Sequence, residues 1–153
     1  FKLFKRVSGD WRGNLKFVHS DAVKWLKAQQ KPFDVLLEDL SIGRDGDVFK
    51  PAVSSDVLPY LVHSKLKQSG IAIFNLLPPD DRTWAKMIQA VSEPFTSGLI
   101  ISFESFYNKV LILSVKPLTS TPKISRFLRN LLSGIQSSMF CDIQVRTLRI
   151  TKS

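Results

Sequence analysis

Phe33-Asp-Val-Leu-Leu-Glu-Asp39 joins a short, mostly apolar run to two consecutive carboxylates. A short apolar run bounded by polar residues is typical of a buried strand. In open α/β sheets, ligands bind just outside the carboxyl ends of the strands. We therefore expect Glu38 and Asp39 to lie where a ligand binds, although two solvated loop acids would give the same local pattern.

Segments on both sides of this run alternate between strand and helix patterns. In chain order we expect a strand at 15–18, a helix at 21–31, a strand at 34–38, a polar loop at 41–47, a helix at 54–68, a strand at 71–76, a helix at 81–92, strands at 99–103 and 109–115, a helix at 123–136 and an edge strand at 143–150. Alternation of buried strands with helices predicts a doubly wound, mainly parallel α/β sheet. The two strands 99–103 and 109–115 are separated by a few polar residues, which predicts an antiparallel hairpin at the C-terminal side.

The size and composition bound the class of protein. With 153 residues and 44% hydrophobic residues, the chain is long enough for one domain over 1–153 with its own core. No apolar run is long enough to span a membrane, and the basic start Phe1–Arg6 is unlike a signal peptide. The single cysteine, Cys141, excludes an internal disulfide, and we expect it to be buried or without a role. We expect an intracellular protein, cytoplasmic or in an organelle.

The net charge of +9 favours a polyanionic partner such as nucleic acid or an acidic protein. The positive charge is nevertheless scattered along the chain. Lys123, Arg126 and Arg129 come closest to a cluster, and their helical spacing is more typical of a solvated helix face than of an RNA-binding motif. With two histidines and one cysteine, the chain predicts no metal site.

Three segments together resemble class I S-adenosylmethionine-dependent methyltransferases, and most of all their spermidine-synthase-like branch. They are Asn14-Leu-Lys-Phe-Val-His-Ser-Asp-Ala-Val-Lys-Trp-Leu26, then 33–39, then Leu66-Lys-Gln-Ser-Gly-Ile-Ala-Ile-Phe-Asn75. The resemblance covers about residues 14–116 and implies a Rossmann-like core there, with 117–153 adding a C-terminal helix and edge strand. Each segment alone is a weak signal, and their order and spacing make the match moderately specific.

The resemblance also implies a site. Asp21 and Ala22 match the acidic–small pair whose acid accepts a hydrogen bond from the adenine amino group of the cofactor. Asp39 matches the acid that lies beside the sulfonium and the acceptor, which makes it both a cofactor-binding and a catalytic candidate. Asn75, at the end of the next strand, is expected to line the pocket, and the loop 40–53 to cover the acceptor site. The implied cofactor is S-adenosylmethionine or its decarboxylated form, and the implied acceptor is a protein or a small amine.

Two departures from the family pattern leave alternatives open. Ile42 stands where spermidine synthases carry a second aspartate, which disfavours aminopropyl transfer to a polyamine. The first strands of the family, with their glycine-rich loop, are not visible before residue 14. The sheet would then have an exposed parallel edge at its centre, which is an aggregation hazard. Three explanations stay open: the remaining strands lie outside these residues, another chain supplies them, as in a homo-oligomer, or the fold is a decayed one that serves as a scaffold. A non-catalytic methyltransferase-like scaffold for an RNA- or protein-rich assembly is therefore the second hypothesis.

Overall fold

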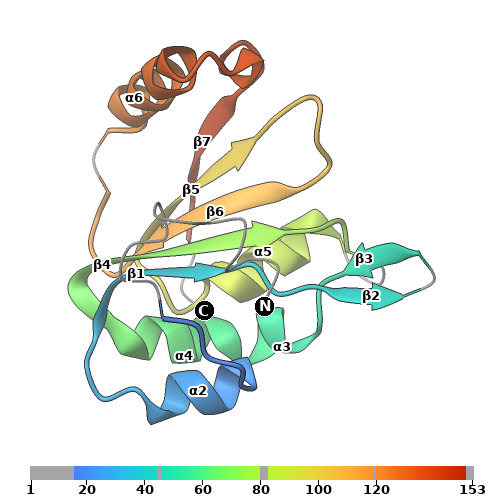
Figure 1. Cartoon of the computed structure of the whole chain (residues 1–153). Helices are drawn as coiled ribbons and strands as arrows, with labels where there is room; N and C mark the ends of the chain where they lie inside the picture. The colour runs from blue at the N-terminus through green and yellow to red at the C-terminus, as the bar shows by residue number, and fades with distance from the viewer. Residues whose placement is uncertain (1–15, 45, 80–82, 119, 151–153) are drawn as a thin grey trace.

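The computed structural model describes residues 16–44, 46–79, 83–118 and 120–150 (Figure 1). Its elements are α2 (Ala22–Ala28), β1 (Phe33–Glu38), β2 (Ile42–Arg44), β3 (Asp47–Phe49), α3 (Val53–Asp56), α4 (Leu58–Lys65), β4 (Leu66–Leu76), α5 (Trp84–Ser92), β5 (Ser97–Ser102), β6 (Lys109–Ser114), α6 (Thr121–Gly134), the 3₁₀ helix η2 (Ser138–Phe140) and β7 (Gln144–Leu148). Five strands form one sheet in the order β1-β4-β6-β5-β7, and β2 and β3 form a separate two-stranded sheet.

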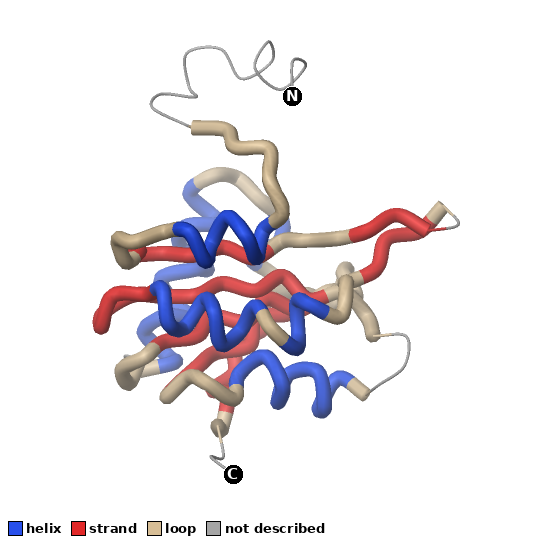
Figure 2. The backbone as a smooth tube through the Cα atoms, turned by 90° about the horizontal axis from the view of Figure 1, so that it is seen from below, coloured by secondary structure: helices blue, strands red, loops and turns tan. Residues whose placement is uncertain are grey.

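The sheet carries helices on both faces. Figures 1 and 2 show α2, α3, α4 and α5 on one face and α6 on the other. The main core lies between the first helical layer and the sheet, where Phe74 and Leu111 are neighbours on β4 and β6 and are fully buried. Met87 and Val91 of α5 pack into the same cluster from the helical side. This two-sided cover is the arrangement of an α/β sheet, and it confirms the expected fold class.

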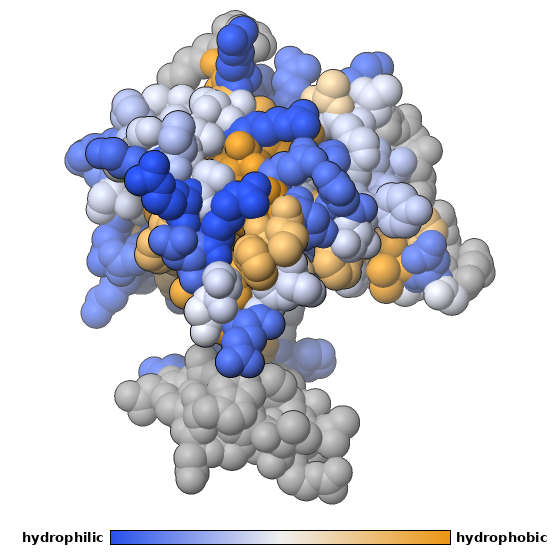
Figure 3. All heavy atoms as spheres, turned by 90° about the horizontal axis from the view of Figure 1, so that it is seen from above, coloured by the Kyte–Doolittle hydropathy of each residue, from blue (hydrophilic) through white to orange (hydrophobic). Residues whose placement is uncertain are grey.

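The opposite face of the sheet is covered unevenly. Leu99 and Ile101 of β5 are buried on the side where α6 lies, whereas Val35 and Leu37 of β1 are 55% and 66% exposed. Figure 3 shows the molecule from this side, where hydrophilic residues cover most of the surface and apolar side chains gather near the centre. Within the described residues, β1 pairs only with β4, so its outer edge has no described strand beside it.

The parallel part of the sheet is smaller than expected. The β1–β4 pair is parallel, and the pairs β4–β6, β6–β5 and β5–β7 are antiparallel. The predicted hairpin β5–β6 and the edge strand β7 are confirmed. The predicted strand at 15–18 is wrong for residues 16–18, which form no strand, and Leu15 lies outside the described residues. Because that strand is missing, only one parallel pair remains among the described strands.

The segment after β1 is not the polar loop that the sequence predicted. Residues 42–49 form a two-stranded antiparallel arm, β2–β3, in which Ile42 lies opposite Phe49. The arm projects from the carboxyl end of β1 beyond the main sheet (Figures 1 and 2). Each strand has three residues, too few for an alternating pattern to be recognised in the sequence. Gly46 turns the chain at the tip with a φ of 83°, which favours glycine.

The helix expected over 54–68 is split and shorter. Pro59 has no N–H to donate to the carbonyl of Ser55, so α3 ends at Asp56 and α4 begins anew at Leu58. The helix then ends at Lys65, and Ser69–Gly70, expected as its C-terminal end, lies inside β4. Leu66 adopts an extended conformation because it is buried and pairs with Phe33 at the start of β1.

Two further findings concern Cys141 and the search for membrane-spanning helices. Cys141 is exposed rather than buried. No described helix combines the length and apolar character that a membrane span requires.

Candidate functional site

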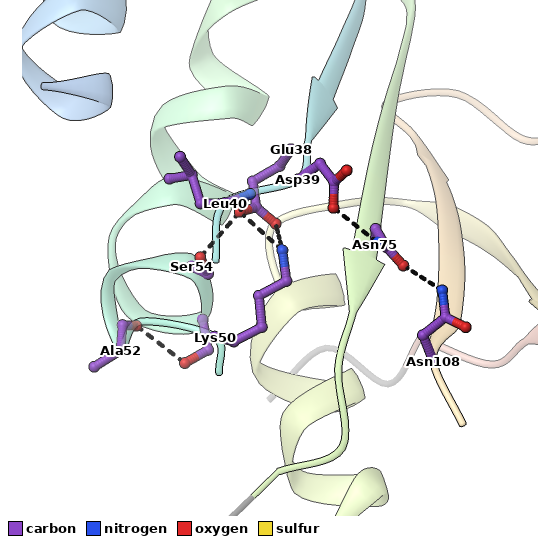
Figure 4. Close-up of polar contacts among 9 residues, drawn as sticks. Glu38, Asp39, Leu40, Lys50, Ala52, Ser54, Asn75 and Asn108 are labelled. Atoms are coloured by element: carbon purple, nitrogen blue, oxygen red, sulfur yellow. Dashed lines mark hydrogen bonds and ion pairs between the residues drawn. The ribbon is translucent and has the colours of Figure 1, made fainter. Parts of the chain in front are cut away.

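The carboxyl end of β1 holds a buried ion pair. The Glu38 carboxylate accepts hydrogen bonds from Lys50 Nζ at 2.9 and 3.1 Å, from Ser54 Oγ at 3.0 Å and from the Leu40 N–H at 2.9 Å (Figure 4). The Glu38 and Lys50 side chains are each 5% exposed. A buried carboxylate needs such a set of donors to offset its lost hydration. Glu38 therefore fixes the base of the arm to β1, and its carboxylate is not available to a ligand.

Asp39 has a different environment, because it is exposed at the rim of the sheet. Its Oδ1 accepts a hydrogen bond of 2.7 Å from Asn75 Nδ2, and Asn75 Oδ1 accepts one of 2.8 Å from Asn108 Nδ2 (Figure 4). Since a carboxylate only accepts, the Asn75 amide group must point its N–H₂ at Asp39 and its carbonyl at Asn108. The three side chains thus form an ordered chain across the ends of β1 and β4 and the residue before β6.

Asp21 and Ala22 lie at the start of α2. Asp21 is the N-cap, and its Oδ1 accepts a hydrogen bond of 2.8 Å from the Lys24 N–H. This contact explains why the helix begins there, since a capping carboxylate satisfies an otherwise unpaired backbone donor. Asp21 is exposed, whereas Ala22 is partly buried and lines a pocket.

A pocket of about 140 Å³ lies between α2, the end of β1 and α4. Ala22 and Asp39 both line it, and its remaining lining is mostly apolar: Trp25, Leu26, Leu36, Leu37, Glu38, Leu40, Leu58 and Val62. A dry cavity of about 150 Å³ holds a single benzene ring, whereas drug-sized ligands occupy about 300–1,000 Å³. The described residues therefore offer room for one small ring system with a carboxylate at its edge.

A larger pocket, about 360 Å³, lies elsewhere, between α5 and the residues around the end of β7. It contains none of the residues that the sequence singled out. Its charged lining residues, Glu93 and Arg149, are both exposed. We therefore place the candidate site at the smaller pocket, where the predicted residues meet.

The structure brings the sequence-predicted residues together in two ways, through a shared pocket and through a hydrogen bond. Ala22 and Asp39 share the pocket, and Asp39 binds Asn75 directly. Asp21 adjoins Ala22 but uses one carboxylate oxygen as a helix cap. The sequence did not predict Asn108 or Lys50, because an asparagine in a polar loop and a lysine twelve residues after its partner belong to no periodic pattern. Among the described residues, no cluster of potential metal ligands is present.

The comparisons with known proteins locate the fold. The structure is similar to the crystal structure of human methyltransferase-like protein 13 in complex with SAH, with a TM-score of 0.64 and 18% sequence identity over 90% of this chain and 68% of that chain. Neither the scan against protein families nor the search of curated proteins finds a match. This chain therefore has the fold of class I S-adenosylmethionine-dependent methyltransferases.

Proposed function

We propose that this chain is part of an S-adenosylmethionine-dependent methyltransferase with its cofactor site at the carboxyl end of β1. The observation that carries the proposal is the shared pocket of Ala22 and Asp39, two residues distant in sequence that the family resemblance assigned to one cofactor. The fold supports it, because the similar human protein was determined with SAH bound.

The residues present fit one part of such a cofactor. The small apolar pocket suits a ring such as adenine, with Ala22 allowing close approach and Asp21 accepting a hydrogen bond from the amino group. Asp39 would stabilise the cationic sulfonium, and most strongly where water is excluded. The bound cofactor supplies an electrophilic methyl group. The remainder of so large a ligand needs surface beyond the described residues.

The acceptor is a protein or a small amine. Methyl transfer requires a deprotonated nucleophile held in line with the methyl group, and Asp39 is placed to hold an amine or to take its proton. Asn75 keeps that carboxylate oriented. Assignment to the spermidine-synthase-like branch rests on the sequence resemblance. Ile42 in place of an acid argues against aminopropyl transfer and against a decarboxylated cofactor.

A non-catalytic scaffold is the second candidate, and two observations favour it. The pocket is small for a complete cofactor, and the net charge of +9 suits a polyanionic partner. The basic residues Lys123, Arg126 and Arg129 of α6 are all exposed, as expected of a solvated helix face, and Arg129 also donates hydrogen bonds to the carbonyls of Phe140 and Ile143. The two candidates differ in one measurable property, the binding of the cofactor.

Calorimetric titration of S-adenosylmethionine, its decarboxylated form and S-adenosylhomocysteine into the intact protein tests the proposal. We expect Asp21→Ala to weaken binding by about 1–3 kcal/mol, the cost of leaving a buried donor of the ligand unpaired. Thr83→Ala is the matched control, because Thr83 caps α5 in the same way but lies away from the pocket. Equal affinity of the wild type and Asp21→Ala for the cofactor would show that Asp21 is not part of the site. If none of the three compounds binds, the methyltransferase proposal is rejected and the non-catalytic scaffold remains as the candidate function.

A further inference from the structure

The carboxyl edge of the sheet carries more exposed surface than a small acceptor would use. At one end, the β2–β3 arm exposes Ile42 and Val48, at 50% and 53%. At the other end, the loop between β5 and β6 exposes Phe106 and Tyr107, at 51% and 87%. Figure 1 shows the arm and this loop on the same side of the molecule, and the Asp39–Asn75–Asn108 chain links the strand ends between them.

The same edge carries three exposed carboxylates, although the whole chain is basic. Lys109 also lies at this edge, where its Nζ is 4.7 Å from the centroid of the Trp84 ring. Asp39, Asp47 and Glu104 are exposed there. The ion pairs among the described side chains, Glu38–Lys50 and Asp34–Lys67, involve neither Asp39 nor Glu104. Asp142, beside the loop, accepts a hydrogen bond from Ser105 Oγ at 2.7 Å through Oδ2. Its Oδ1 is buried and has no partner among the described residues. The exposed carboxylates of Asp39 and Glu104 thus present oxygens at this edge that can accept hydrogen bonds from a cationic ligand.

The spacing of these acids selects the kind of ligand. Asp39 follows β1 and Glu104 follows β5, and these strands are first and fourth in the sheet order. Three strand spacings of about 4.8 Å separate them by roughly 14 Å. An extended polypeptide crosses this distance in about four to five residues, at about 3.3 Å per residue. A single small amine can occupy one acidic position but uses none of the exposed aromatic and aliphatic surface.

We propose that the carboxyl edge, from the β2–β3 arm to the 103–108 loop, docks an extended basic segment of a protein. This inference rests on the proposed function and narrows its acceptor to a polypeptide. The exposed aromatic side chains provide apolar contact area of the kind that dominates peptide and protein interfaces. The carboxylates provide complementarity to lysine or arginine, and Asp39 receives the side chain nearest the cofactor pocket. Asn75 and Asn108 are positioning residues, because they hold Asp39 at that rim.

The test uses a fluorescently labelled peptide of alternating lysine and valine, about seven residues long so that it spans the edge. Its binding to the intact protein is measured by fluorescence anisotropy without cofactor. The net charge of +9 disfavours nonspecific association with a cationic peptide, so binding reports on the local surface. We expect the peptide to bind, the glutamate–valine peptide not to bind, and spermidine at equal concentration not to displace it.

Paired variants locate the contact. We expect Phe106→Ala and Asp39→Asn each to weaken binding about tenfold, as residues central to an interface do. Phe127→Ala and Asp34→Asn are matched controls: Phe127 is 65% exposed on α6, and Asp34 lies toward the other end of β1 in an exposed pair with Lys67. Both controls should bind like the wild type.

Absence of peptide binding would overturn the inference, as would displacement by spermidine, equal binding of the acidic peptide or equal losses in the control variants. The cofactor titration fails or succeeds separately. Peptide binding without cofactor binding would therefore reject the methyltransferase proposal and leave the docking surface.

Discussion

Two adjacent acids at the end of β1 have opposite roles. Glu38 is buried and paired with Lys50, whereas Asp39 is exposed and bound only to a neutral amide. The alternation of side chains along a strand explains the difference, because successive residues point to opposite faces. Glu38 points into the helical layer and stabilises the structure, and Asp39 points to the rim, where its carboxylate is exposed.

Removing Lys50 should reveal the cost of an unpaired buried charge. We expect Lys50→Met to lower the free energy of unfolding by about 3–5 kcal/mol, because it leaves Glu38 buried without a cation. Lys67→Met should lower it by at most about 1 kcal/mol, since the Lys67–Asp34 side chains are 46% and 76% exposed. Urea denaturation of both variants measures the difference. Equal losses would show that Glu38 is hydrated in solution.

Tyr60 provides a pH-dependent test of the contact between α4 and the end of α5. A hydrogen bond with Glu93, together with partial desolvation and the Glu93 charge, raises the pKa of Tyr60 above 10.0. Because the folded pKa is the higher one, this contribution to stability is fully present below the unfolded pKa and is lost as the pH rises through the folded pKa.

Ultraviolet titration of the phenolate measures this pKa in a Tyr107→Phe background, where Tyr60 is the remaining tyrosine. We expect Glu93→Gln to lower the Tyr60 pKa toward its ordinary value. An unchanged titration curve would remove the contact with Glu93.

At the scale of elements, close backbone approach decides where β1 and β4 can pair. A Cβ on Gly70 would lie 2.9 Å from the Phe33 carbonyl oxygen and 3.0 Å from that of Lys67. Both neighbours are backbone atoms. The Phe33 oxygen belongs to β1, so the two strands must separate there, and the Lys67 oxygen belongs to β4 itself, so β4 must also change its backbone conformation. The register of the β1–β4 pair already shifts between Phe33 and Val35 at this point.

We therefore expect Gly70→Ala to destabilise the protein by roughly 1–3 kcal/mol, as overpacking does. Gly134→Ala is the matched control, because nothing lies within 4 Å of its added Cβ and alanine favours the helix α6. It should stabilise by at most about 1 kcal/mol. Thermal unfolding of both variants distinguishes them, and a neutral Gly70→Ala would show that β4 can move away from β1.

Elements with long apolar runs could be predicted from the sequence, and short or context-dependent ones could not. The runs in β1, β4, β5 and β6 gave their positions to within a few residues, except the start of β4. The β2–β3 arm was missed because its strands have three residues each, too few for an alternating pattern, and because the Glu38–Lys50 contact at its base joins residues that are distant in sequence. Asp39 and Asn75 were predictable as strand-end polar residues, but Asn108 was not, since only the folded hairpin brings it to Asn75.

At the scale of the whole molecule, helices cover only one face of the sheet at β1, and the side chains on its other face are exposed (Figure 1). Exposed Val35 and Leu37, together with a strand edge that has no described partner, form a surface that favours association with another strand. The exposed parallel edge that the sequence led us to expect stays a prediction, which the following experiment tests.

Sedimentation velocity on the 153-residue chain tests this surface. We expect Leu37→Lys to reduce self-association, because a charged residue on an exposed strand opposes edge-to-edge pairing. Unfolding of the variant should remain close to that of the wild type, since Leu37 is 66% exposed. Leu36→Lys is the contrasting change and should unfold the protein, because Leu36 packs against the core. A sedimentation profile that Leu37→Lys leaves unchanged would exclude this surface from association.

The ion pair at the base of the β2–β3 arm closes residues 39–49 into a loop with its own anchor. Changes at the tip around Gly46 are thereby separated from the five-stranded sheet, and lengthening a surface loop costs little free energy. The arm can therefore accept a longer or differently charged tip without loss of the fold, and such a change would alter the surface at the carboxyl edge of the sheet while leaving the core unchanged.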